Sequence, residues 1–192
     1  MLLTRPRALS LVVAVLTAAF AVAATTAGAA SKVHTVPAKV WVGAVCGSID
    51  AWDADLEARL AAVGRMTPAE PSPASARDAL ASAYGGAAAR TDELVVMLSI
   101  AGTPAGKGGR SAARELVATY RGAAEALREA RDQVASAPDE LDAVSDAAAK
   151  ASTTLGVTLA EVVADGSGLP AGRTALARLV ANDPTCTRVA LR

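Results

Sequence analysis

The sequence predicts an all-α protein, an antiparallel four-helix bundle with a short C-terminal helix, closed by one disulfide. Alanine, the best helix former, makes up about a quarter of the chain, and aromatic residues are only 3%. Apolar residues recur three and four apart, which is the spacing of one helix face. Four long amphipathic segments with short connections are typical of an antiparallel bundle.

The first thirty residues predict a secretory signal. Arg5 and Arg7 form a short basic region, an apolar run of about 17 residues follows at 8–24, and Ala-Gly-Ala at 27–29 fits a cleavage site. The alternative is an uncleaved membrane anchor. The run is at the lower limit of length for a spanning helix and is rich in alanine, which favours cleavage. We therefore assign residues 1–30 to a signal peptide.

The remaining chain suits one domain. We assign residues 31–36 to an N-terminal extension and 37–192 to a single helical-bundle domain, long enough to bury about 70% of its unfolded surface. Without Arg5 and Arg7 the chain keeps 17 basic against 19 acidic residues. This balance argues against nucleic acid as a partner and against electrostatic attachment to an anionic membrane.

The first predicted helix spans about residues 37–65. Pro37 suits its first turn, because the N–H that proline lacks would be unbonded there. A linker at 66–73 follows, and its three prolines end the helix. The apolar stripe of this helix consists of Trp41, Val45, Ile49, Trp52, Leu56, Leu60 and Val63.

The second predicted helix spans about residues 73–101, with Ser72 as its cap and Pro73 at its first position. Gly85-Gly86 lies within it and predicts a kink or a place where two backbones meet. A loop at 102–109 follows. The buried side of this helix is predicted to consist of Leu80, Tyr84, Leu94, Leu98 and Ala101.

The third predicted helix spans about residues 110–137. Its polar face carries two expected i,i+4 ion pairs, Arg121–Glu125 and Arg128–Asp132. Such pairs contribute a few tenths of a kcal/mol each. Its apolar stripe consists of Ala113, Leu116, Val117, Tyr120, Ala124, Leu127 and Val134.

The fourth predicted helix begins after Pro138, where early carboxylates oppose the positive end of the helix dipole. Glycines at 166–168 end it. A short fifth helix at 171–181 leads to a tail that carries Cys186. The apolar stripe of the fourth helix consists of Leu141, Val144, Ala148, Ala151, Leu155, Leu159 and Val162.

Cys46 and Cys186 are predicted to form a disulfide that joins the first helix to the tail. Disulfides are typical of exported proteins. A reactive thiol pair is the alternative, but redox motifs space cysteines as C-x-x-C, which is absent here. Closing a loop of about 140 residues restricts the unfolded chain by roughly 5 kcal/mol in the entropy model.

The loop at 103–109 contains Gly106-Lys107, a pair that phosphate-binding loops also contain. Such a loop needs a glycine where Ala101 stands and a serine or threonine where Gly108 stands, so we predict a flexible connector. His34 is the single histidine of the chain, and it lies in the N-terminal extension. Because no Glu-x-x-His motif is present, we predict no metal site.

Two sets of residues in the first helix favour structural roles. Asp50, Asp53 and Glu57 recur at helical spacing, which is typical of a solvated flank. Trp41 and Trp52 share one side and resemble a sugar-stacking platform, but both fall on the apolar stripe, which favours core packing. There is no G-x-S-x-G motif and no histidine in the helical domain to act as a base. We therefore predict a protein that is not an enzyme, without catalytic or cofactor-binding residues.

The segment 40–52, with Cys46 and Trp52 in a C-x5-W pattern, resembles the opening of a group of small secreted helical proteins common in actinobacteria. The turn at 102–104 before a long Ala/Arg/Glu helix and the cysteine near the C-terminus are similar to that group as well. The resemblance implies secretion, a helical bundle and a bridge between Cys46 and Cys186. It implies no catalytic residue.

These observations predict a secreted or cell-envelope protein that acts by binding, as an interaction module for an unknown envelope or extracellular protein. The alternatives are a carrier of a small apolar ligand in the bundle interior and an uncleaved signal-anchored envelope protein. An apolar cavity between the helices would favour the carrier, whereas an exposed apolar patch would favour the interaction module. We expect no nucleic acid partner and no cofactor, and membrane contact only through an uncleaved signal.

Overall fold

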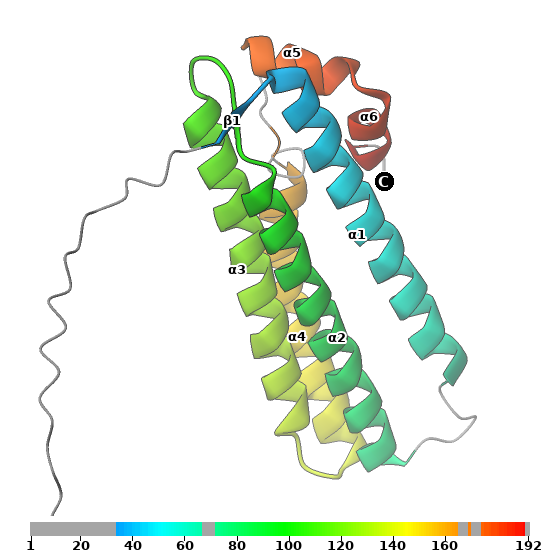
Figure 1. The fold of residues 1–192 in the computed structure, drawn as a ribbon. Coiled ribbons are helices and arrows are strands. Elements are labelled where there is room, and N and C mark those ends of the chain that lie inside the picture. Colours follow the sequence, from blue (N-terminus) through cyan, green and yellow to red (C-terminus); the bar gives the residue numbers. More distant parts are fainter. Residues whose placement is uncertain (1–33, 67–71, 165–168, 170–173, 191–192) are drawn as a thin grey trace, which may run out of the picture. The chain divides into compact units, whose positions relative to one another are not determined.

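Most of the residues that the structure describes lie in helices (Figure 1). The computed structural model describes residues 34–66, 72–164, 169 and 174–190. The predicted helical class is confirmed, and so is its closure by a disulfide. The predicted signal peptide, residues 1–30, lies outside the described residues. The helices in the described ranges are α1 (Ala38–Met66), α2 (Pro73–Ile100), α3 (Gly109–Ala135), α4 (Leu141–Ala164), α5 (Ala175–Asn182) and α6 (Pro184–Ala190).

The start of α2 shows the predicted capping. The Ser72 hydroxyl accepts a hydrogen bond from the backbone N–H of Ser75 at 3.2 Å, and Pro73 occupies the first turn. The helix continues through Gly85-Gly86. A Cβ atom on Gly85 would lie 3.3 Å from Cδ of Arg131, and one on Gly86 would lie 3.2 Å from a guanidinium nitrogen of Arg59. The close approach is therefore to side chains of α3 and α1.

The helix α6 was not expected from the sequence, which placed Cys186 on a tail. Asp183 caps this helix, because its carboxylate accepts hydrogen bonds from the backbone N–H groups of Thr185 at 2.9 Å and Cys186 at 3.2 Å. Pro184 stands at the first helical position, where proline is favoured. An Asp-Pro pair was thus the signal for α6.

A short parallel strand pair closes one end of the helices. The strand β1 (Thr35–Val36) pairs with β2 (Thr103–Pro104), and the N–H of Thr103 donates to the His34 carbonyl at 2.9 Å. Residues assigned to the N-terminal extension thus join the fold. Gly102 has a φ of 81°, and a Cβ atom there would lie 2.7 Å from the His34 carbonyl oxygen, so glycine is needed.

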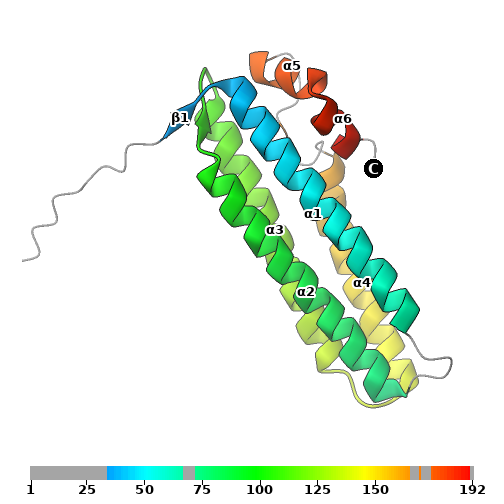
Figure 2. The same ribbon diagram turned by 45° about the vertical axis from the view of Figure 1, so that its right-hand side comes forward.

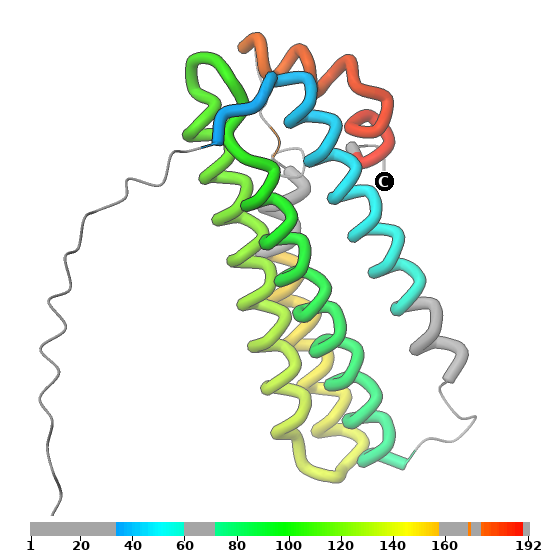
Figure 3. The backbone as a smooth tube through the Cα atoms, viewed as in Figure 1, coloured from blue at the N-terminus to red at the C-terminus, as the bar shows by residue number. Residues whose placement is uncertain are grey.

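Each long helix packs along its neighbour in the chain, α1 with α2, α2 with α3, and α3 with α4, while α6 packs on α1 (Figures 1 and 2). The same path is visible in the backbone trace (Figure 3). A first core cluster gathers large side chains from both ends of the chain. It consists of Trp41, Val42, Val45, Cys46, Ile49, Trp52, Leu94, Leu98, Leu116, Tyr120, Ala123, Leu169, Leu176, Cys186 and Val189.

A second core cluster lies among α2, α3 and α4 and is built mainly of alanine. Small side chains let helix axes approach closely, as the alanine-rich stripes predicted. Among the predicted stripe residues whose side chains the structure describes, one is wrong: Leu141 is 60% exposed, because it is the first residue of α4. The side chains of Leu60, Val63, Leu159 and Val162 lie outside the described part. The second cluster consists of Ala88, Ala126, Leu127, Ala130, Val134, Ala151 and Leu155.

The ion pairs of α3 differ from the expected i,i+4 pattern. Arg128 reaches across to α2 and donates to both oxygens of Asp92, at 3.0 and 2.8 Å. Asp132 pairs instead with its neighbour Arg131, at 2.7 Å. Within the described ranges, no ion pair joins Arg121 to Glu125. Arg128 thus pairs with a carboxylate of the neighbouring helix α2 and not with the residue expected on its own helix.

Candidate functional site

The two cysteines predicted to pair do so. Cys46 of α1 and Cys186 of α6 form a disulfide with Cα atoms 5.0 Å apart, within the ordinary range for such bonds. Both side chains are buried in the first core cluster. A buried disulfide inside a packed core is not placed for exchange with other thiols, which favours the structural role over a reactive pair.

The two tryptophans lie inside the molecule. Trp41 is 1% exposed, and its ring N–H donates to the Gly102 carbonyl at 3.0 Å. Trp52 is also buried, and its ring meets that of Tyr120 edge to face, with centroids 5.2 Å apart. Neither ring presents a face to solvent for stacking on a sugar. The predicted core role of both tryptophans is confirmed.

The three acidic residues singled out in α1 lie in different environments. Asp50 lies 3.7 Å from the guanidinium of Arg188 in α6, and Asp53 is half-buried near Tyr120. Glu57 is exposed. Among the residues that the structure describes, no group of three His, Cys, Asp or Glu side chains is arranged to hold a metal ion.

A buried polar cluster joins α1, α2 and α3. The ring N–H of Trp52 donates to the Thr91 hydroxyl at 3.0 Å, and that hydroxyl donates to the Ala87 carbonyl at 2.9 Å. The Tyr120 hydroxyl is buried beside them without a hydrogen-bond partner among the described residues. Burial, and to a lesser extent the charge of Asp53, raises the pKa of Tyr120 above its ordinary value. Perturbed groups often mark active sites, but the Tyr120 side chain is fully covered and has no opening to a substrate.

We expect the two hydroxyls of this cluster to contribute differently to stability. Thr91→Val should lower the free energy of unfolding by about 1–3 kcal/mol, because the Trp52 N–H would stay buried without an acceptor. Tyr120→Phe should cause no loss, since it removes a hydroxyl that makes no hydrogen bond. Urea unfolding followed by circular dichroism measures both. An equal loss from both variants would contradict the assignment.

The wild type and the Tyr120→Phe variant are expected to differ in stability at alkaline pH. Because the pKa of Tyr120 is raised on folding, the unfolded chain loses this proton first, and the wild type loses stability as pH rises above about 10. Tyr120→Phe should lack that part of the decline. Unfolding midpoints measured between pH 8 and pH 11, values chosen around about 10, show the difference.

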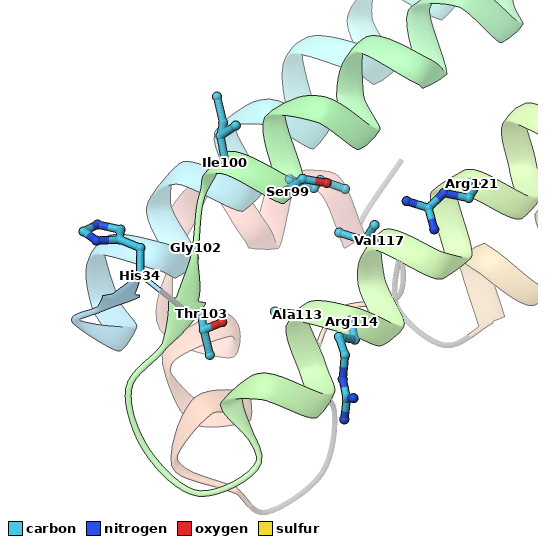
Figure 4. Close-up of a pocket in the computed structure, with 10 residues that line it drawn as sticks. His34, Ser99, Ile100, Gly102, Thr103, Ala113, Arg114, Val117 and Arg121 are labelled. Carbon is cyan, nitrogen blue, oxygen red and sulfur yellow. The ribbon is translucent and has the colours of Figure 1, made fainter. Parts of the chain in front are cut away.

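A groove of about 820 Å³ lies at the ends of α2 and α3, beside the strand pair (Figure 4). We call it the α2–α3 groove. Its size falls within the range of small-molecule and cofactor sites. Figure 4 shows the Arg121 side chain directed across the groove toward Ser99, with Val117 between the helices. The lining residues are His34, Leu98, Ser99, Ile100, Gly102, Thr103, Ala113, Arg114, Val117 and Arg121.

The positive charge of this groove is not neutralised from within. Arg114 and Arg121 make no hydrogen bond or ion pair with any residue that the structure describes. The first turn of α3 carries no acidic residue, and its cap, Gly108, makes no side-chain hydrogen bond. The partial positive charge of the helix N-terminus therefore adds to that of the arginines.

The last turns of α2 present an apolar face next to the groove. Val96, Met97 and Ile100 are 58%, 50% and 68% exposed. Ile100 lines the α2–α3 groove, and Met97 lines a smaller hollow of about 160 Å³ between α1 and α2. The apolar face thus lies between two hollows.

The sequence indicated only some of the residues that line this groove. Lys107, noted for its place in a glycine-rich loop, is exposed in the connection from β2 to α3 and does not line the groove. His34 does line it, although the sequence placed it in an extension. Arg114 was not singled out, and Arg121 was expected only as the ion-pair partner of Glu125. Their seven-residue spacing, shared with Arg128, was the available signal.

The fold and the groove define a helical, disulfide-closed protein with an open, cationic and partly apolar surface site. No helix in the described ranges is long and apolar enough to cross a membrane. Comparison with protein-family models, with curated proteins and with solved structures found no match.

Proposed function

We propose that this chain is an exported protein of the cell envelope or the extracellular space that acts by binding a protein partner, without catalysis. The Cys46–Cys186 disulfide supports this location, because such bonds persist in oxidising compartments. The basic and apolar pattern of residues 1–30 supports export. The resemblance to small secreted actinobacterial proteins favours the same location and stays a prediction.

The four long helices are proposed to form an antiparallel bundle. Packing of each long helix along the next one in the chain supports this arrangement, as do the short connections at 101–108 and 136–140. The bundle acts as a rigid frame, with α2 and α3 presenting the α2–α3 groove at one end. Sites on helices are held more precisely than sites on loops.

The exposed apolar face of Val96, Met97 and Ile100 is the observation that carries the binding function. Large apolar side chains gathered on one helix, next to a hollow, are typical of interaction surfaces. The larger groove opens at the surface, where a segment of a partner has access. This position favours the interaction module over a carrier, whose ligand would lie in the bundle interior.

Photocrosslinking in the producing cell tests this function. A photoreactive amino acid replaces Ile100 in one variant and Val157 in the other. Val157 of α4 is 62% exposed and lines neither hollow, so it is a matched control. We expect position 100 to yield a discrete protein adduct of one mass, and position 157 to yield none.

Equal adducts from both positions would indicate random contact and contradict the proposal. A lipid or other small molecule crosslinked at position 100 would support the carrier instead. Both variants replace exposed side chains, so we expect both to fold, and their circular dichroism spectra check this.

A further inference from the structure

We infer that the α2–α3 groove binds an acidic peptide segment of the partner protein, in which two carboxylates pair with Arg114 and Arg121 on either side of an apolar side chain. This inference rests on the binding function proposed above and adds the chemistry of the ligand. Three features support it: a break in the charge pattern across the helices, the apolar lining between the arginines, and acidic residues nearby that disfavour other anions.

The charge pattern is a row of three arginines on α3. Arg114, Arg121 and Arg128 are seven residues apart, so they lie on the same side of the helix about 10 Å from one another. Arg128 is paired with Asp92 of α2 through two hydrogen bonds. Seven residues after Asp92, α2 carries Ser99, which lines the groove with Arg121 but has no charge.

The missing acid leaves Arg121 available to an outside carboxylate. The Ser99 hydroxyl donates to the Val95 carbonyl of its own helix at 2.7 Å and makes no hydrogen bond with Arg121. The same helix pair thus shows one arginine bound by a carboxylate and, two turns further along, one without. An aspartate or glutamate of a ligand would occupy the place that Asp92 takes beside Arg128, with a similar two-pronged geometry.

The space between the two arginines is apolar. Val117 lies between Arg114 and Arg121 on α3, and Ile100 lines the groove from the end of α2 with its side chain pointing away from Val117 (Figure 4). A segment with two carboxylates about 10 Å apart therefore places an apolar side chain against Val117. That distance corresponds to three residues of extended chain or seven residues of helix. Figure 4 shows the Arg114 and Arg121 side chains pointing in different directions, so in this arrangement a single phosphate or headgroup does not contact both.

The surroundings disfavour a dense polyanion. Glu115 follows Arg114 directly, Glu125 lies one turn beyond Arg121, and both are exposed. Uniform negative charge, as on an anionic bilayer or a nucleic acid, would meet these carboxylates together with the arginines. Like charges in contact are unfavourable, so the pattern selects separated carboxylates. The observations therefore favour a peptide over a lipid surface.

Blocked fluorescent peptides test the inference by anisotropy with the oxidised protein. Each peptide carries two glutamates flanking leucine, with one to seven residues between them, and a matched set carries glutamine instead. We expect binding to peak where the carboxylates are about 10 Å apart and to fall by about tenfold or more in the glutamine set, the effect of roughly one charge-assisted pair.

Ser99→Asp is the decisive variant, because it places an internal carboxylate opposite Arg121. We expect it to weaken peptide binding by about tenfold while the thermal midpoint does not fall. Ser99→Asn is the matched control, of the same shape without charge, and should bind like the wild type. Arg114→Gln and Arg121→Gln should each weaken binding, because each removes one of the two cations.

Peptide binding that is equal for glutamate and glutamine, or unchanged by Ser99→Asp, would overturn the inference. Vesicles with an anionic headgroup, tested beside neutral ones, provide the other arm, and binding to them with no peptide binding would also overturn it. The proposed function is tested separately, by the photocrosslinking experiment. A protein adduct at position 100 without acidic-peptide binding would keep the function and remove this ligand class.

Discussion

Replacing both cysteines by alanine is expected to cost the protein a large share of its stability. The double variant Cys46→Ala/Cys186→Ala opens a loop of 140 residues, and the entropy model gives a loss of about 5 kcal/mol as an upper value. Small domains have only about 5–15 kcal/mol in total. Alanine is chosen because a serine hydroxyl would be buried without a partner. Urea unfolding of the oxidised and variant proteins measures the loss.

The loss should begin at α6. This helix has seven residues, too few to persist alone, and it is held on α1 by the disulfide and by buried Val189. Amide hydrogen exchange should therefore rise first at 184–190 in the double variant. Val189→Ala is the control, since it weakens the same contact by about 2 kcal/mol but keeps the covalent bond. Equal unfolding midpoints for wild type and double variant would contradict the structural role.

The helices were predictable because their signals are local. The Ser72-Pro73 cap, the prolines of the linker and the apolar stripes depend on neighbours within one or two turns, and they gave the bounds of α1, α2 and α3 closely. The Trp41 and Trp52 stripe was correct for the same reason. Leu141 was wrong because a stripe does not show which of its residues stand at an exposed helix end.

The features that were missed depend on residues distant in the chain. The pairing of β1 with β2 brings residue 35 beside residue 103, and two-residue strands are too short for an alternating pattern. Arg128 pairs with Asp92 on α2 and not with Asp132 on its own helix. The α2–α3 groove could not be predicted from the sequence for the same reason. Its lining residues come from the N-terminal extension, α2, β2 and α3, which only the fold brings together.

Trp41→Ala is expected to be the most damaging single substitution in the core. The side chain is 1% exposed and belongs to the first core cluster, so its removal leaves a large cavity and should cost about 3–5 kcal/mol. Urea unfolding measures this loss. Val157→Ala, at an exposed position of α4, is the matched control and should change stability by less than about 0.5 kcal/mol.

Trp41 also links the core to the α2–α3 groove, and Trp41→Phe separates the two roles. Phenylalanine keeps most of the apolar contact but cannot donate to the Gly102 carbonyl, which adjoins Thr103 in the groove wall. We therefore expect a smaller loss of stability, with faster amide exchange at Thr103 and Ala105, whose N–H groups bond the β1 segment. Unchanged exchange at both amides would show that core packing alone holds this wall. Faster exchange would show that a tryptophan in the core fixes one edge of the α2–α3 groove.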